Sequence, residues 1–238
     1  MKLAALFSGG KDSTYVIHLA RKAGHEVKYL ATIHSKNSAS YMYHSINIGL
    51  TVIQSQALGI KLISKESLGE KEQEVHDLEI LLKDLEIDGV LCGAIASTYQ
   101  KKRVQAVCKK LNLKLIAPLW DIKPDKYMQD LINNNFKVII TGVFAEGLGK
   151  EWLGREINSE NLAKLKKVEH KHKINLAGEG GEFETTVIDC PLFSQSIQIT
   201  DSQIHWHKDK TGFFEIKNVK LIPKNNNPNN QEEIKGYV

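Results

Sequence analysis

The residues best suited to chemistry lie near the amino terminus, where positions 8–13 read Ser-Gly-Gly-Lys-Asp-Ser. Adjacent glycines let a phosphate group approach the main chain, and Lys11 can bind it through charge-assisted hydrogen bonds. The hydroxyls of Ser8 and Ser13 supply two further donors. A carboxylate would repel a phosphate, so we expect Asp12 to hold Mg²⁺ or to orient Lys11. The pattern predicts a phosphate-binding loop made of Ser8, Gly9, Gly10, Lys11, Asp12 and Ser13.

The sequence on either side of this loop predicts the elements that position it. Residues 3–7 form an apolar run typical of a buried strand, and an apolar stripe with helical spacing follows at residues 16–23. A helix that begins at the loop directs its free N–H groups toward a bound anion. The spacing fits neither a Walker loop, G-x-x-x-x-G-K-[ST], nor a dinucleotide fingerprint, G-x-G-x-x-G. The alternative is a tight strand-to-helix turn with a serine cap.

A second candidate region, residues 93–103, follows an expected strand at residues 88–93. Ligands of open parallel sheets bind at the carboxyl ends of the strands, so we expect Gly93 to lie beside the nucleotide. Gln100 and Arg103 share one face of the helix expected after it, where they could bind a phosphate or carboxylate. A solvated arginine near an ordinary helix start explains the same spacing equally well.

A third region, residues 178–186, combines three glycines with three carboxylates. In an extended chain Glu182 and Glu184 project to one face and Phe183 to the other. Together with Glu179, these carboxylates could hold Mg²⁺, hold a substrate amine or ammonium, or act as a general base. The alternative is a charged surface turn that leads into a strand.

Strands alternate with helices along the first half of the chain, which predicts an α/β fold of the Rossmann-like kind: a parallel sheet with helices on both faces. Pro118 and Pro124 bracket an expected junction, and from Phe183 onward the pattern changes to short β-like runs at residues 186–188, 197–199, 203–207 and 213–221. We therefore expect an ATP-binding domain at residues 1–122 and a smaller α+β substrate-binding domain at residues 123–224. The polar residues 225–238 are expected to form a disordered tail.

The composition is that of an ordinary globular protein of 238 residues, with 42% hydrophobic and 25% charged residues. No apolar run approaches a membrane span of roughly 20 residues, and the start of the chain lacks a signal-peptide pattern. Three cysteines without a C-x-x-C pair argue against a disulfide framework or a zinc site, so we expect a cytoplasmic protein with no membrane partner. The net charge of +4 is too small to predict a nucleic-acid partner. The oligomeric state, a homodimer included, stays open.

Two smaller features favour structural roles. His205 and His207 alternate on one face of an expected strand, but no third ligand accompanies them with metal-binding spacing. The basic residues between positions 164 and 173 are typical of a solvated helix face, with an acidic partner surface as the alternative.

Five motifs in a fixed order make the sequence resemble a known family. The Ser-Gly-Gly-Lys-Asp-Ser loop resembles the pyrophosphate loop (PP-loop) of the N-type ATP pyrophosphatases. After it come residues 93–104, Pro118-Leu119-Trp120, residues 152–155 and the Gly-Glu-Gly-Gly-Glu-Phe-Glu-Thr segment at 178–185. Together they resemble the diphthine–ammonia ligase family, also called diphthamide synthase, from Met1 to about Pro223.

The resemblance implies an ATP-dependent ligase that converts the diphthine carboxylate of translation elongation factor into an amide. ATP and Mg²⁺ are the implied cofactors, and the elongation factor and ammonium the implied partners. Attack of the carboxylate on the α-phosphorus would give an acyl-adenylate and release pyrophosphate, and ammonia would then displace AMP. We expect catalytic roles for Lys11, Asp12, Glu182 and Glu184, and contacts to ATP from residues 8–13 and Gly93. We expect contacts to the substrate from Gln100, Arg103, Glu179 and Glu182, and Mg²⁺ binding by Asp12.

Two other functions remain open. ATP-dependent RNA-modifying enzymes share the first loop, but thiolases of this type commonly need paired cysteines, and Cys92 and Cys108 fall on different expected elements. A nucleotide-sensing module that binds ATP or AMP without turnover is the third hypothesis. Free ammonium is the expected nitrogen donor. An enzyme that takes ammonia from glutamine needs an accessible nucleophile, typically a cysteine, and all three cysteines lie in or beside segments expected to be in the core or in the β part.

Overall fold

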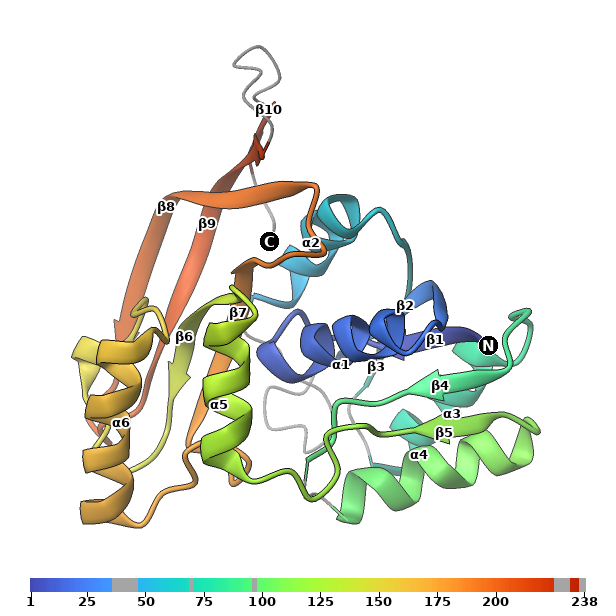
Figure 1. Cartoon of the computed structure of the whole chain (residues 1–238), viewed down its shortest axis with the longest axis horizontal. Helices are drawn as coiled ribbons and strands as arrows, with labels where there is room; N and C mark the ends of the chain where they lie inside the picture. Colours follow the sequence, from blue (N-terminus) through green and yellow to red (C-terminus); the bar gives the residue numbers. More distant parts are fainter. Residues whose placement is uncertain (36–46, 69–70, 96–97, 225–231, 236–238) are drawn as a thin grey trace. The chain divides into compact units, whose positions relative to one another are not determined.

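The computed structural model describes residues 1–35, 47–68, 71–95, 98–224 and 232–235. The chain forms two compact units (Figure 1). Unit 1 comprises Met1–Gln56 and Ile60–Asp121, and unit 2 comprises Ala57–Gly59 and Ile122–Val238.

Unit 1 contains a five-stranded parallel sheet in the order β3-β2-β1-β4-β5. Its strands are β1 (Lys2–Leu6), β2 (Glu26–Ser35), β3 (Lys61–Ser67), β4 (Gly89–Leu91) and β5 (Lys114–Ile116). The helices that connect them are α1 (Lys11–Lys22), α2 (Thr51–Leu58), α3 (Lys71–Leu82) and α4 (Thr98–Lys110), with a short 3₁₀ helix, η1 (Ile48–Leu50), before α2. The strand order reverses between β1 and β4, and ligands of such sheets bind at that position.

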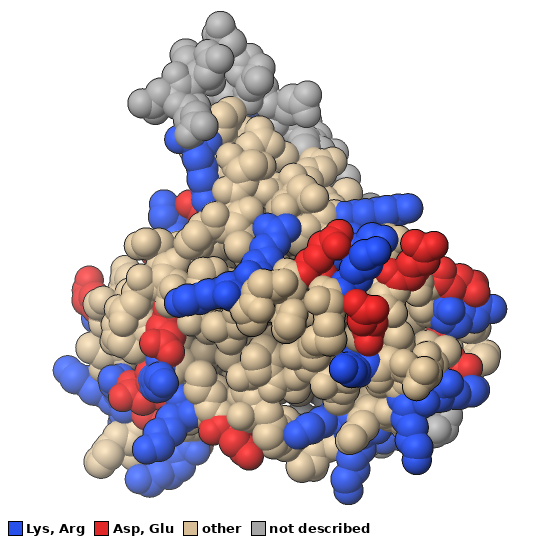
Figure 2. All heavy atoms as spheres, turned by 45° about the vertical axis from the view of Figure 1, so that its right-hand side comes forward, with Lys and Arg blue, Asp and Glu red and all other residues tan. Residues whose placement is uncertain are grey.

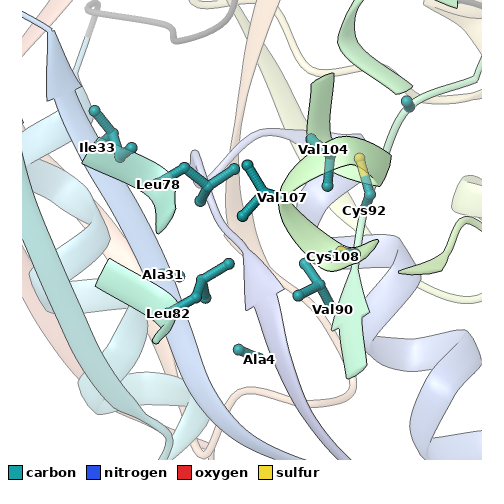
Figure 3. Close-up of a cluster of buried hydrophobic side chains, with 11 residues drawn as sticks. Ala4, Ala31, Ile33, Leu78, Leu82, Val90, Cys92, Val104, Val107 and Cys108 are labelled. Carbon is teal, nitrogen blue, oxygen red and sulfur yellow. The ribbon is translucent and has the colours of Figure 1, made fainter. Parts of the chain in front are cut away.

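Both faces of this sheet are buried, as the alternation of strands and helices predicts. Leu78 and Leu82 of α3 pack with Val104 and Val107 of α4 over one face, where Ala4 of β1 also lies (Figure 3). Successive side chains of a strand point to opposite faces, so the fully buried neighbours of Ala4 face the other side, where α1 contacts β1, β2 and β4. Burial on both faces explains why β1 is apolar without alternation.

Unit 2 contains an antiparallel sheet in the order β10-β9-β6-β7, with β8 paired to β9. Its strands are β6 (Lys137–Val143), β7 (Phe183–Asp189), β8 (Gln195–Trp206), β9 (Gly212–Pro223) and β10 (Glu232–Lys235). The helices α5 (Pro124–Asn133) and α6 (Ser159–His172) contact each other, with Lys166 Nζ 2.5 Å from Asp125 Oδ1, and η2 (Lys150–Trp152) is a short 3₁₀ turn. The α+β part predicted for the second half of the chain is therefore present.

Two expectations about the second half of the chain were wrong. Residues 197–199 and 203–207 were expected as separate strands, but residues 197–199 and 203–206 both belong to β8. This strand continues past a register shift at Asp201 because β9 pairs with it on both sides of the shift. The tail was expected to be disordered from residue 225. Within it, Glu232–Lys235 form β10, because β9 extends far enough to offer these residues an antiparallel partner. Residues 225–231 and 236–238 lie outside the described part of the chain.

None of the helices in the described part of the chain has the length and apolar character that a membrane span needs. On the face shown in Figure 2, Lys and Arg side chains are interspersed with Asp and Glu. This mixture agrees with the small net charge of +4.

Candidate functional site

The loop between β1 and α1 carries a buried lysine at its centre. Lys11 is the first residue of α1 and is only 3% exposed. Its ammonium lies 2.9 Å from the carboxylate of Asp12. Burying an ammonium is costly without an opposite charge, and the Asp12 carboxylate supplies one at this place. The contact fits the expectation that Asp12 orients Lys11.

The two serine hydroxyls close the loop on itself. Ser8 Oγ lies 3.3 Å from Ser13 Oγ, and Ser13 Oγ also donates to the carbonyl oxygen of Gly10 at 3.2 Å. Gly10 is the N-cap residue of α1 and has no side chain to cover the first turn of the helix. The helix start, the glycines, the buried ammonium and the two hydroxyls together form a donor set that suits an anion.

Gly93 lies against the first turn of α1. A Cβ atom built on Gly93 would stand 2.9 Å from the carbonyl carbon of Asp12 and 3.0 Å from the backbone nitrogen of Ser13. Only a glycine lets the segment after β4 approach the phosphate loop this closely. The structure therefore brings Gly93 and residues 8–13 together, as their positions at the ends of β4 and β1 predict.

Two further residues of unit 1 contact this loop, and sequence reasoning missed both. Gln54 of α2 is fully buried, and its Nε2 donates to the carbonyl oxygen of Gly9 at 2.8 Å. Thr32 of β2 is 1% exposed, and its Oγ1 donates to the carbonyl oxygen of Phe7 at 2.7 Å. The sequence holds only a weak signal for Gln54, a long polar side chain in a short helix whose apolar residues Ile53 and Ala57 are both buried.

The predicted substrate residues of α4 lie at its amino-terminal end. Arg103 is half-buried in the second turn of the helix. Gln100 belongs to the first turn, but its side chain lies outside the described part of the structure. Nearby, the ammonium of Lys101 stands 3.6 Å from the centre of the Trp120 ring, a cation–π contact that joins α4 to the segment after β5.

The glutamate-rich segment of unit 2 forms a turn that leads into β7, and its own hydrogen bonds hold its shape. Gly178 and Gly181 adopt positive φ angles of +73° and +82°. The carboxylate of Glu182 accepts two backbone N–H bonds inside this loop, from Asn175 at 2.7 Å and from Gly180 at 2.7 Å. Phe183 is buried beneath Gly178, as the predicted alternation requires. We infer that Glu182 holds the shape of the loop, because each of its two oxygens accepts a backbone hydrogen bond.

Glu179 and Glu184 are the other two carboxylates of this segment, and both are half-buried. Glu184 pairs with Gly142 in the register between β7 and β6. A Cβ on Gly142 would collide with the ring of Phe144, at 2.7 Å, and would lie 3.2 Å from Cβ of Glu184. The exposed Phe144 ring thus lies over Gly142, beside the start of β7.

The histidines and cysteines take structural positions. His205 Nε2 lies 2.7 Å from the Glu215 carboxylate, and its ring stacks on Phe213. Among the described residues, no group of three or more His, Cys, Asp or Glu is arranged to hold a metal ion.

All three cysteines are buried, and burial raises the pKa of Cys108 and of Cys190 to about 11. Such thiols stay protonated at neutral pH, so neither is a nucleophile there.

Comparison with known proteins agrees with both halves of this description. Residues 1–115 match the family model of the diphthamide synthase N-terminal domain, and residues 123–222 match that of the C-terminal domain. The chain is 34% identical over 232 residues to the diphthine–ammonia ligase of Bos taurus, covering 87% of this chain and 86% of that protein. It is 35% identical over 230 residues to the diphthine–ammonia ligase of Mus musculus, with the same coverage.

Two further matches are more limited. The diphthine–ammonia ligase of Schizosaccharomyces pombe is 33% identical over 227 residues, but this chain spans only 37% of that longer protein. A solved structure described as a predicted subunit of tRNA methyltransferase from Methanocaldococcus jannaschii matches 80% of this chain with a TM-score of 0.44 and 15% identity. The identity to the animal enzymes along nearly their whole length, together with the two matching domain models, shows that this chain belongs to the diphthine–ammonia ligase family.

Proposed function

We propose that this protein is an ATP-dependent ligase that converts the diphthine carboxylate of translation elongation factor into an amide with ammonium. The observation that carries this proposal is the phosphate loop at the point where the strand order reverses, with Lys11 buried at its centre. Membership of the family supports the choice of substrate. The balanced reaction consumes a carboxylate, ammonia and ATP, and it gives an amide, AMP and pyrophosphate.

The residues of the phosphate loop bind ATP and stabilise the leaving pyrophosphate in this proposal. Lys11 neutralises negative charge on the β- and γ-phosphates, and the hydroxyls of Ser8 and Ser13 donate to phosphate oxygens. Gly10 leaves the start of α1 uncovered by a side chain, and Gly9 and Gly93 let Gln54 and the first turn of α1 pack closely around the loop. The α-phosphorus stays accessible to the substrate carboxylate, which forms an acyl-adenylate that ammonia then attacks.

Asp12 is the residue that we assign to Mg²⁺. Its side chain is 29% exposed, so it can reach an ion while it stays close to Lys11. Mg²⁺ bound with nucleotides takes one or two carboxylates, and phosphate oxygens and water complete the shell. A single aspartate therefore fits this ion, and Mg²⁺ would offset charge that develops on the departing pyrophosphate.

The other predicted site residues serve the substrate in this proposal. Gln100 and Arg103 bind an anionic group of the substrate, since a guanidinium pairs bidentately with carboxylate or phosphate. Glu179 and Glu184 attract the cationic substrate or ammonium and take up the proton released when ammonia attacks. Glu182 contributes by holding the loop that carries Glu179, through its bonds to Asn175 and Gly180.

Ammonium is the proposed nitrogen donor, because a glutamine amidotransferase needs an accessible nucleophile such as cysteine. Cys92, Cys108 and Cys190 are all buried in the described structure. The same observation weakens the alternative of an RNA thiolase, which commonly uses paired reactive cysteines. A nucleotide sensor without turnover remains the other alternative, and the experiment below separates it from a ligase.

Pyrophosphate exchange tests the proposal at its first chemical step. The protein is mixed with ATP, Mg²⁺, radiolabelled pyrophosphate and diphthine-bearing elongation factor, without ammonium. We expect label to enter ATP only when the modified factor is present, because adenylation of its carboxylate is reversible. Exchange that proceeds equally with an unmodified factor, or no exchange at all, would contradict the proposal.

A further inference from the structure

Side chains donate hydrogen bonds to three backbone carbonyl groups, two in the phosphate loop and one in the residue before it. The carbonyl oxygen of Phe7 accepts a hydrogen bond from Thr32, and that of Gly9 accepts one from Gln54. The carbonyl oxygen of Gly10 accepts bonds from Ser13 Oγ at 3.2 Å and Thr14 Oγ1 at 2.9 Å. The donors Thr32 and Gln54 come from other elements of unit 1, β2 and α2.

The side chain of Gln54 packs directly against Gly9. Gly9 has a φ of +76°, a backbone conformation that glycine adopts without strain. A Cβ atom on Gly9 would stand 2.0 Å from Oε1 of Gln54, so the glutamine amide lies directly against the glycine backbone. Gln54 is fully buried, and its Nε2 lies 2.8 Å from the Gly9 carbonyl oxygen.

The planarity of the peptide bond gives this contact a consequence for ligand binding. In a trans peptide the C=O of one residue and the N–H of the next point in opposite directions. No peptide bond in the described chain is cis. A carbonyl of Gly9 that is fixed toward Gln54 therefore directs the N–H of Gly10 away from Gln54.

We propose that Gln54 is a positioning residue that fixes the Gly9–Gly10 peptide so that its N–H group faces the bound phosphates. This inference rests on the proposed function, because it assumes that the loop binds ATP. Glycine peptides rotate easily, and a flipped Gly9–Gly10 peptide would present a carbonyl oxygen to the ligand in place of an N–H donor. Several N–H groups that converge on one point form an anion site, and a single reversed peptide weakens it. Thr32 differs in its effect, because the N–H of the Phe7–Ser8 peptide donates to Ser13 Oγ at 3.3 Å.

The test compares two glutamines of the same helix. Gln54→Met keeps the length of the side chain but removes the donor to Gly9. Gln56→Met makes the same chemical change on an exposed position of α2 and serves as the control. Calorimetric titration with Mg²⁺-ATP and with inorganic pyrophosphate gives the affinities, and thermal unfolding gives the stability of each variant.

We expect Gln54→Met to weaken the binding of both ligands by roughly tenfold, which corresponds to about 1.4 kcal/mol, while Gln56→Met binds like the unchanged protein. Ser55→Ala controls for stability: it removes the bond from Ser55 Oγ to the Val52 carbonyl oxygen, at 2.6 Å, without touching Gly9. We expect this variant to lose stability but not affinity. An affinity loss common to Gln54→Met and Ser55→Ala would make the effect one of folding and overturn the proposal.

A second variant keeps the proposal testable if Gln54→Met does not fold. Gln54→Glu preserves the shape of the side chain but offers no donor when ionised, so we expect at least the same loss of affinity. Normal ATP affinity in the folded variant would refute the inference about Gln54. If the unchanged protein itself bound neither ATP nor pyrophosphate, the proposed function would fail instead, which is a different result.

Discussion

Replacement of Gly93 by alanine is the sharpest test of the geometry around the phosphate loop. The added Cβ would lie 2.9 Å from the Asp12 carbonyl carbon, 3.0 Å from the Ser13 nitrogen and 3.1 Å from the Asp12 oxygen. All three atoms belong to the backbone, so no side chain can rotate away to relieve the contact. Either the segment after β4 or the first turn of α1 must move by a few tenths of an ångström.

The size of the effect follows from this overlap. Overpacking by one methyl group in a well-packed place costs about 1–3 kcal/mol of stability. The displaced atoms carry the ligand-facing N–H groups, and misplacement of a reacting group by about 1 Å can cost roughly a hundredfold in rate. For the smaller shift at Gly93 we expect the affinity for ATP and the rate of turnover to fall by roughly tenfold.

Gly24→Ala is the matched control for this experiment. Gly24 follows the opposite end of α1, has a φ of +77° and has no atom within 4 Å of an added Cβ. Alanine there should lower stability through backbone strain and leave ATP binding unchanged. Urea unfolding and ATP titration of both variants give the answer. Ordinary ATP affinity in a folded Gly93→Ala protein would show that the loop after β4 does not shape the site.

Three other predictions concern single groups. Lys11→Ala should weaken ATP binding by roughly ten- to a hundredfold, as expected for the loss of a charged hydrogen bond. Lys22→Ala, in the exposed last turn of α1, should leave ATP binding unchanged. Equal ATP affinities of the two variants would contradict the proposal that residues 8–13 bind the phosphates. Glu182→Gln should leave ATP affinity unchanged but reduce amide formation, because an amide cannot accept both N–H bonds from Asn175 and Gly180. Glu160→Gln makes the same change at an exposed position and is the control. Normal turnover of Glu182→Gln would show that the glutamate-rich segment has no part in the mechanism. Burial raises the pKa values of Cys108 and Cys190 to about 11, so the thiols of the unfolded chain ionise at lower pH than those of the folded protein. The free energy of unfolding should therefore fall as pH rises from about 9 toward 11. Cys108→Ala should make this fall with pH less steep, and an equally steep fall in both proteins would contradict the prediction.

The sequence predicted the elements of unit 1 well because each has a strong local signal. β1 is apolar from Leu3 to its end at Leu6, since both faces of the sheet are covered, and the two glycines directly precede α1. The position of Gly93 beside the phosphate loop follows from a general rule for parallel sheets, which bring the carboxyl ends of β1 and β4 to one edge. Topology alone was enough to place these residues in one region.

The residues that sequence reasoning missed act through contacts between distant segments. Gln54 lies 45 positions from Gly9, and no local periodicity reports a bond between a side chain of α2 and a backbone carbonyl. The role of Glu182 toward the substrate stays a prediction, but the two bonds that its carboxylate accepts from Asn175 and Gly180 could not be predicted from residue spacing. The length of β8 was underestimated because its exposed residues near Asp201 are polar, and only the pairing with β9 identifies them as a strand.

Amide formation on the modified elongation factor tests the central claim most directly. The purified protein receives ATP, Mg²⁺, diphthine-bearing factor and isotopically labelled ammonium, and the modified histidine is analysed by mass spectrometry while AMP and pyrophosphate are quantified. We expect the label in the side-chain amide, with AMP and pyrophosphate formed in equal amounts to the amide. Labelled glutamine without ammonium should give no labelled amide. Release of ADP and phosphate, or AMP formation that is independent of the factor and accompanied by no amide, would contradict the account.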